Sequence, residues 1–578
     1  MYPCAMCSTY GYSCTYNNEG AGDTTTGGLH FSPFAEYGAL DGERHSSNTS
    51  PVPIPGPATA PVSATRSPTN QSDTGPGPQS STQSPAVAAA TSASPGIFDA
   101  QKFRHSGASA AMAFPHILGV ALGSHSPPKT RSFAYNFGVR PEETSNAHCF
   151  LANLISQDDL AFFSDVYFSI LGPIGDVIDP QIYAQRCQAY YLSLGRNANG
   201  VAFAAVAAGI AALGSFLSRA SHTKHPRESE LVAYAKSILD DPASMRLHGI
   251  DHIVAWGLRV LYLRATTRPS NAWIASCTQM HLAEAIGLHL EENVMKMAGS
   301  PNAMARGHDA DRLRRIFWVS WAGHVMLCYE YDREPVRFGA VTCGAVAEVA
   351  GSVAGQFVKL IQIIPSPNSP FQLDSQRGTL TPSEELIQRL GVLDTFHTTH
   401  PFLVVTKADI AFAFYRRLYT CKIRIPDEAI NVIIDAGNAA VDAATQQATQ
   451  GHLFWNVIGS VFQYACILLA VDTPTASAHL GTAFRGLEDL VQAADTPLTR
   501  EALGVARHLL CLSKAKKRRE LELLEGVEAG YRFSSGQAGL EPGTNVDAVA
   551  MPDVGVELDW DQFFIEPFFS LPWPDVQL

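Results

Sequence analysis

The stretch DADRLRRIFWVSWAGHVMLCYEYDREPVRF, residues 309–338, decides the fold of this 578-residue chain. Its apolar side chains recur at steps of three and four residues, a spacing that places them on one face of an α-helix. The residues on that face are Leu313, Ile316, Phe317, Trp321, His324, Val325 and Cys328. The stretch therefore predicts an amphipathic helix.

The same helical signature extends over residues 145–530. Three helix starts place a capping hydroxyl before a proline at the first helical position, at Thr381-Pro382, Thr473-Pro474 and Thr496-Pro497. Few segments alternate like strands, and no repeated βα unit occurs. We expect an all-α domain of about a dozen helices. Residues 339–380 are the exception, and their Gly, Ser and Pro predict a long loop with a helix in its first half.

One helical stretch, Gly200–Leu217, is nearly uncharged and close to the minimum length of a membrane span. It consists mostly of alanine and glycine, which contribute little transfer free energy. We therefore expect a buried helix in a tightly packed core and no membrane partner.

Composition restricts the class of protein. The formal net charge of -13 argues against broad electrostatic adhesion to nucleic acid or anionic membranes, although a small basic module remains compatible with it. The eleven cysteines are an odd number, and most are scattered singly through apolar stretches, which is typical of reduced intracellular thiols. The N-terminus lacks the pattern of a secretory signal.

Both flanks of the helical domain have a different composition. Residues 17–140 are dominated by Ser, Thr, Pro, Gly and Ala, which bury too little surface to offset their ordering entropy, so we expect a disordered linker. Residues 534–578 interleave acidic side chains with Phe and Trp. This composition is typical of disordered transcriptional activation segments, and the alternative is a tail that docks onto its own helical domain.

Cysteines gather at the N-terminus in the pattern Pro3-Cys4-Ala-Met-Cys7-x6-Cys14. Two cysteines two residues apart can chelate one metal ion from a single turn, and a third can close on it. Zinc in thiolate sites takes four tetrahedral ligands, so Cys4, Cys7 and Cys14 leave its coordination incomplete. The alternative is an N-terminus whose cysteines have no metal role.

This spacing resembles the second half of the fungal zinc binuclear cluster, in which six cysteines hold two zinc ions. Pro3 also matches the proline beside the fourth cysteine of that family. The resemblance implies that Cys4 is a bridging thiolate and that Cys7 and Cys14 are terminal ligands of one zinc ion. It also implies DNA as a partner.

The chain departs from this pattern before Cys4. The family's first three cysteines and its Lys/Arg-rich segment, which supplies phosphate and base contacts, are absent, and no Lys or Arg precedes Arg44. We hypothesise that the start is a gene-model truncation and that an upstream exon encodes the rest. The alternative is a natural variant that no longer binds DNA by itself.

The helical region carries a second resemblance, to the regulatory domain of the same fungal factors. Its motifs stand in order at Gly287-Leu288-His289, Arg314–Trp318 and Arg333-Glu334-Pro335. Gly323-His324 departs from the usual Asp-Arg. The resemblance covers residues 150–340 and implies an all-α regulatory domain that responds to a partner or small effector.

Other polar clusters in the domain have structural interpretations. Arg312, Arg314 and Arg315 are expected to form a solvated or ion-paired face rather than a phosphate site. The histidines of this region, which are His281, His289, His308 and His324, share no metal-ligand spacing and are expected to be core or surface residues.

A cationic cluster, Lys514–Arg519, is followed directly by glutamates. It fits a solvated helix with i,i+4 ion pairs, or alternatively a nuclear-import signal.

Motifs of the common enzyme classes are missing. The sequence contains no Walker loop, no GxGxxG after a strand, no GxSxG and no HExxH. Paired acids occur at Asp158-Asp159 and Asp240-Asp241, and the second pair is expected to end a helix. We therefore predict that the chain is not an enzyme.

Together these observations predict a nuclear, zinc-dependent, DNA-binding regulator of transcription by RNA polymerase II. Its tail would contact a coactivator, and a homodimer is a further possible assembly. The alternative is a co-regulator or interaction protein that uses the helical domain without binding DNA.

Overall fold

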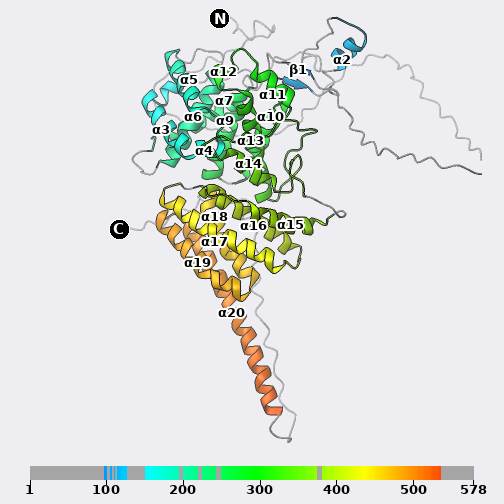
Figure 1. The fold of residues 1–578 in the computed structure, drawn as a ribbon. Helices are drawn as coiled ribbons and strands as arrows, with labels where there is room; N and C mark the ends of the chain where they lie inside the picture. The colour runs from blue at the N-terminus through cyan, green and yellow to red at the C-terminus, as the bar shows by residue number, and fades with distance from the viewer. Residues whose placement is uncertain are drawn as a thin grey trace, which may run out of the picture. The chain divides into compact units, whose positions relative to one another are not determined.

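The computed structural model describes residues 97–99, 104–106, 110, 114–125, 150–193, 200–218, 224–241, 249–267, 269–373, 380–452 and 454–534. Within these residues nearly all regular structure is helical, which confirms the all-α prediction with eighteen α-helices rather than a dozen. Figure 1 shows how they pack.

The helices of the first group precede α15 (Pro382–Thr395), and the last of them lies within the long loop of residues 339–380. They are α2 (Phe114–Ala121), α3 (Gln157–Ile170), α4 (Gly172–Gly175), α5 (Pro180–Leu192), α6 (Gly200–Leu217), α7 (Glu228–Leu239), α9 (Ile250–Thr266), α10 (Pro269–Ala285), α11 (Glu291–Ala298), α12 (Ala303–Arg306), α13 (Ala310–Glu330) and α14 (Ala354–Gln362). The second group is α15 (Pro382–Thr395), α16 (Pro401–Thr420), α17 (Asp427–Thr449), α18 (Trp455–Val471), α19 (Pro474–Ala493) and α20 (Pro497–Ser534).

A small hairpin and a single 3-10 turn complete the regular structure of the described residues. Strands β1 (Ile97–Asp99) and β2 (Arg104–Ser106) pair antiparallel, with Phe98 opposite His105, and the turn is η2 (Leu151–Asn153). The hairpin and α2 lie within the segment expected to be a linker, so ordered elements begin earlier than the composition indicated.

Local sequence signals explain where several helices begin. Thr381 caps α15 in a reciprocal capping box with Glu384, and Thr473 caps α19. Thr496 accepts a hydrogen bond from the backbone N–H of Thr499 at the start of α20. Asp240 ends α7, as expected for the acidic pair before a proline. In the loop of residues 339–380, α14 straddles the middle instead of lying wholly in the first half.

Helix α6 spans the nearly uncharged residues whose number is close to the minimum for a membrane span. Most of its side chains are buried against other helices, among them Ala208, Ile210 and Ala211, which have no exposed surface. Among the described residues, no helix is long and apolar enough to cross a bilayer. Small side chains let α3, α7 and α9 approach α6 closely, and the Phe163 backbone packs directly against Gly214.

The N-terminal half of α13 is fixed by buried ion pairs. Arg312 and Arg315 both reach Asp176, at 2.7 and 2.9 Å, while Arg314 pairs with Glu291. The Arg315 side chain is only 5% exposed. The prediction of an ion-paired face is confirmed, but the pairs are more buried than a solvated face would be.

We predict that Asp176→Ala lowers the free energy of unfolding by about 3 kcal/mol, because it leaves a buried guanidinium without its counter-charge. Chemical denaturation would measure the loss. The matched control is Glu334→Ala, which removes an exposed partner of Arg337 and is expected to cost less than about 1 kcal/mol. Equal losses in the two variants would contradict this assignment.

Candidate functional site

The predicted zinc ligands, Cys4, Cys7 and Cys14, lie outside the described residues. In the part of the chain that the structure describes, no group of three or more His, Cys, Asp or Glu side chains could hold a metal ion. The cysteines described there are all free thiols. The zinc site therefore stays a prediction, and the described residues direct attention to a different feature.

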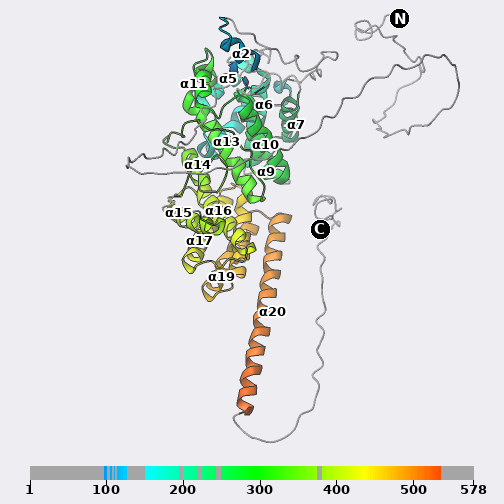
Figure 2. The ribbon, with the colours of Figure 1, turned by 90° about the vertical axis from the view of Figure 1, so that its right-hand side faces the viewer.

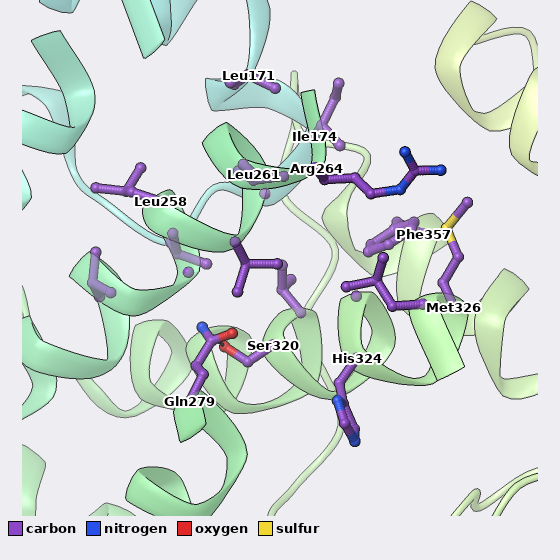
Figure 3. Close-up of a pocket in the computed structure, with 18 of the residues that line it drawn as sticks. Leu171, Ile174, Leu258, Leu261, Arg264, Gln279, Ser320, His324, Met326 and Phe357 are labelled. Carbon is purple, nitrogen blue, oxygen red and sulfur yellow. Dashed lines mark hydrogen bonds between the residues drawn. The ribbon is translucent and has the colours of Figure 1, made fainter. Parts of the chain in front are cut away.

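An apolar cavity of about 130 Å³ lies beside the middle of α13 (Figure 3). We call it the apolar chamber. Its walls are aliphatic and aromatic side chains from α9, α13 and α14 and from the turn around α4, including Leu171, Ile174, Leu258, Leu261, Ile316, Val319 and Phe357. An engineered apolar cavity of about 150 Å³ stays dry and accepts benzene, so the apolar chamber has room for one ring-sized group.

The polar side chains at its edge are occupied by other contacts. Gln279 donates through Nε2 to the Ser320 hydroxyl at 2.9 Å and to the Ile253 carbonyl at 3.1 Å. Figure 3 shows Gln279 and Ser320 side by side below the aliphatic wall. These hydrogen bonds link α10 to α9 and α13 and so fix the shape of the apolar chamber. Because they already occupy the Gln279 amide N–H groups, this edge offers a ligand no strong hydrogen-bond donor.

His324 holds the loop after α13. Its Nε2 accepts the backbone N–H of Val336 at 2.9 Å, so Nδ1 carries the proton and donates to the Ser276 hydroxyl at 2.9 Å. Burial lowers the pKa of His324 to about 4. The prediction of a structural histidine is confirmed here, and it holds equally for His289, which is buried and stacks on Phe338.

We expect His324→Asn to destabilise the protein more near neutral pH than in mild acid. The unfolded imidazole titrates at 6.5 and the folded one at about 4, so the stability contributed by the neutral ring is complete above 6.5 and is lost as the pH falls toward 4. The difference in free energy of unfolding between wild type and variant should shrink over that range. A control, His508→Asn, changes an exposed histidine on α20 and should not show this narrowing of the difference. A constant difference would contradict the prediction.

A second, polar cavity of about 60 Å³ adjoins the first. We call it the polar chamber. Its lining combines charged and amide side chains from α9, α13, α16 and α18, namely Arg264, Tyr329, Glu330, Asp409, Arg416, Asn456, Ser460 and Gln463. Arg264, Met326, Glu330 and Trp455 line both chambers. The two chambers therefore share a wall of side chains at the contact between the two helix groups.

Asp409 is the acidic group at the centre of the polar chamber. Burial raises the pKa of its carboxyl to about 7, against an opposing hydrogen bond donated by Ser460. Arg416 lies nearby and donates to the amide oxygen of Gln463. Near neutral pH, Asp409 is therefore divided between its neutral and charged forms.

Replacing this carboxyl by an amide should stabilise the protein in a pH-dependent way. The Asp409 pKa is 3.8 unfolded and about 7 folded, so the folded state keeps a proton that the unfolded state releases, and stability falls as pH rises between these values. Asp409→Asn removes that loss, and we expect a gain of about 1–3 kcal/mol above pH 7 that vanishes near pH 4. Urea denaturation at the two extremes measures it, and a gain that is equal at both would contradict the assignment.

The cationic cluster Lys514–Arg519 lies on an exposed length of α20, which extends past the neighbouring helices (Figure 2). Lys516 and Lys517 pair with Asp472 at 3.0 and 2.7 Å, and Lys516 lies 3.7 Å from Glu520. The solvated, ion-paired helix is confirmed. Nothing in this geometry tests nuclear import.

Sequence reasoning missed both chambers. The groups of the polar chamber come from helices whose residues are far apart in the chain, such as Arg264 on α9 and Asp409 on α16, so no local pattern joins them. The one available signal was Gly323-His324, the departure from the resembling motif, because both residues line the apolar chamber.

Comparisons with known proteins give independent information. The chain is 38% identical to the protein RDR1 of Saccharomyces cerevisiae over 431 residues, which are 74% of this chain and 76% of that protein. It is 31% identical to the transcription factor kojR of Aspergillus oryzae over 421 residues, 73% of each chain. A probable transcriptional repressor of Schizosaccharomyces pombe, C1348.12, is 27% identical over 224 residues, covering 39% of this chain and 47% of that protein. No protein-family model and no solved structure matches.

Proposed function

Since this chain belongs to the family of fungal zinc-cluster transcription factors and is a transcription regulator, we propose that it binds DNA and controls genes transcribed by RNA polymerase II. The observation that carries the proposal is the 31% identity to a named transcription factor over 73% of both chains. The Pro3-Cys4 to Cys14 pattern supports it from the other end of the chain.

In this proposal Cys4, Cys7 and Cys14 are thiolate ligands of zinc. Zinc has a structural role here, because it would fix the fold of a small DNA-reading module. Three thiolates leave one tetrahedral position to another ligand.

The remaining parts receive roles consistent with a nuclear regulator. Lys514–Arg519 would be read by the import machinery, since the cluster is exposed on α20. Residues 534–578 would bind a coactivator by burying their aromatic side chains on contact. We propose no catalytic role, in line with the names of kojR and C1348.12.

One specific observation favours a second candidate function, a co-regulator that does not bind DNA itself. The formal net charge is -13, which disfavours broad electrostatic adhesion to nucleic acid. Such a protein would act through the helical domain on an intact DNA-binding partner.

Zinc content and DNA binding separate the two candidates. We expect the chain starting at Met1 to hold fewer than two zinc ions and not to shift DNA. A longer chain encoded by its native transcript should hold two zinc ions and shift DNA with an affinity that falls steeply with salt. Replacing Cys4, Cys7 and Cys14 by Ser should abolish both properties, while replacing the free, exposed Cys421 and Cys511 by Ser serves as the control.

Transcript sequencing across the Met1 codon tests whether the native transcript encodes a longer reading frame. A frame with C-x2-C-x6-C and several Lys or Arg residues would support the DNA-binding function. An in-frame stop close upstream, without alternative splicing, would contradict it and favour the co-regulator.

A further inference from the structure

We propose that the apolar and polar chambers form one binding site for a small organic acid with an apolar body, the ligand's carboxylate lying in the polar chamber and its body in the apolar chamber. The site itself stands on the described residues alone. Only its meaning, that the acid acts as an effector of transcription, rests on the proposed function.

Continuity between the chambers is the first support. The shared side chains come from α9, α13 and α18, and Arg264 stands between them with its guanidinium 5.5 Å from the centre of the Trp455 ring. Figure 3 shows Arg264 and Met326 at the same side of the apolar chamber, beyond the aliphatic wall of Leu258 and Leu261. A ligand that fills one chamber therefore reaches the wall of the other.

Unpartnered polar groups mark the polar chamber as a place for a hydrogen-bonding head group. Asn456 is 4% exposed, and its side chain hydrogen-bonds the Asp409 carboxyl in the same lining. The Tyr329 hydroxyl and the Nε of Arg264 are buried without a hydrogen-bond partner. Buried polar groups are nearly always paired in folded proteins, so the two unpaired groups that line this one cavity indicate a ligand that supplies partners.

The charges favour an anionic head. Arg264 is paired with Glu330 at 2.5 Å, which leaves Arg416 facing Asp409. Burial favours the neutral form of Asp409, so its carboxyl balances the Arg416 charge only in part near neutral pH. A carboxylate accepts hydrogen bonds from a guanidinium, a hydroxyl and an amide N–H, and Arg416, Tyr329 and Asn456 offer these three donors.

The shape of the apolar chamber sets the body of the ligand. A volume of about 130 Å³ suits one aromatic ring or a branched aliphatic group of similar size. Gly323, in the middle of α13, opens part of this space, because a Cβ built on it would have no atom within 4 Å. A larger side chain at position 323 would occupy the volume that the ligand body needs.

The experiment uses 3-phenylpropionate as the probe, with the full chain and no DNA, in isothermal titration calorimetry. The comparison ligands are 3-phenylpropan-1-ol, which has the body without the carboxylate, and propionate, which has the carboxylate without the ring. We expect saturable binding of 3-phenylpropionate at least about tenfold tighter than either comparison ligand. Absence of binding, or equal affinities for the acid and the alcohol, would overturn the proposal.

Two variants locate the site. Gly323→Leu fills the apolar chamber and should abolish binding. Gly481→Leu lies at an exposed position of α19, where a built Cβ also has no atom within 4 Å, and this control should bind as wild type does. Arg416→Gln should lower the affinity for 3-phenylpropionate by about tenfold and leave the affinity for 3-phenylpropan-1-ol unchanged. Thermal unfolding and circular dichroism check that each variant is folded, and undiminished binding by a folded Gly323→Leu protein would place the ligand elsewhere and overturn the proposal.

Because the assay contains no DNA, its result does not depend on the zinc cluster. A positive result, combined with no DNA binding by the longer chain encoded by the native transcript, would sustain the site and overturn the DNA-binding function. No ligand binding, combined with DNA binding by the longer chain, would overturn the ligand site and sustain the DNA-binding function.

Discussion

Helix α13 is buried along most of its length, and most of its buried polar side chains are paired with groups from other elements. Arg315 finds Asp176 after α4, Ser320 accepts a hydrogen bond from Gln279 on α10, and His324 joins α10 to the following loop. At its C-terminal end, Glu330 pairs with Arg264 of α9. These contacts fix the directions from which the other helices approach α13. Removing one partner leaves a buried polar group without a hydrogen bond or counter-charge.

The same constraint explains why a cavity lies beside α13. Polar contacts at residues 320, 324 and 330 hold α9, α10 and the loop in place, while Gly323 between them provides no side chain to fill the space. Packing of the second helix group adds α16 and α18, through contacts such as Tyr329 with Phe414 and Phe357 with Phe402. The cavity is bounded by these aromatic contacts and the polar groups at their edge.

Much of the fold could be predicted from the sequence, because short segments of the chain determine where the helices begin and which face of each is apolar. Threonine–proline pairs locate the starts of α15, α19 and α20, and the spacing of apolar residues locates α13. The span of α6 is predicted to the residue because its Ala- and Gly-rich composition changes abruptly at both ends. The hairpin of β1 and β2 was missed, since it lies in a segment whose composition indicates a linker.

The polar chamber could not be predicted, because Asp409 and its neighbours become a site only when α13, α16 and α18 pack together. The single sequence signal, the departure at Gly323-His324, belongs to the apolar chamber, and the sequence alone gives it no interpretation. For Cys4, Cys7 and Cys14 the sequence is the informative part. Their spacing indicates zinc binding, and they lie outside the described residues, so the structure does not test it.

In the proposed function, this transcription regulator reaches its genes through a zinc cluster that contains Cys4, Cys7 and Cys14. Chromatin immunoprecipitation with sequencing of the protein expressed from its own locus tests this most directly. The account predicts enrichment at discrete promoters that is lost when the three cysteines are replaced by serine at that locus. Enrichment that is unchanged by the replacement, or no enrichment with either allele, would contradict it.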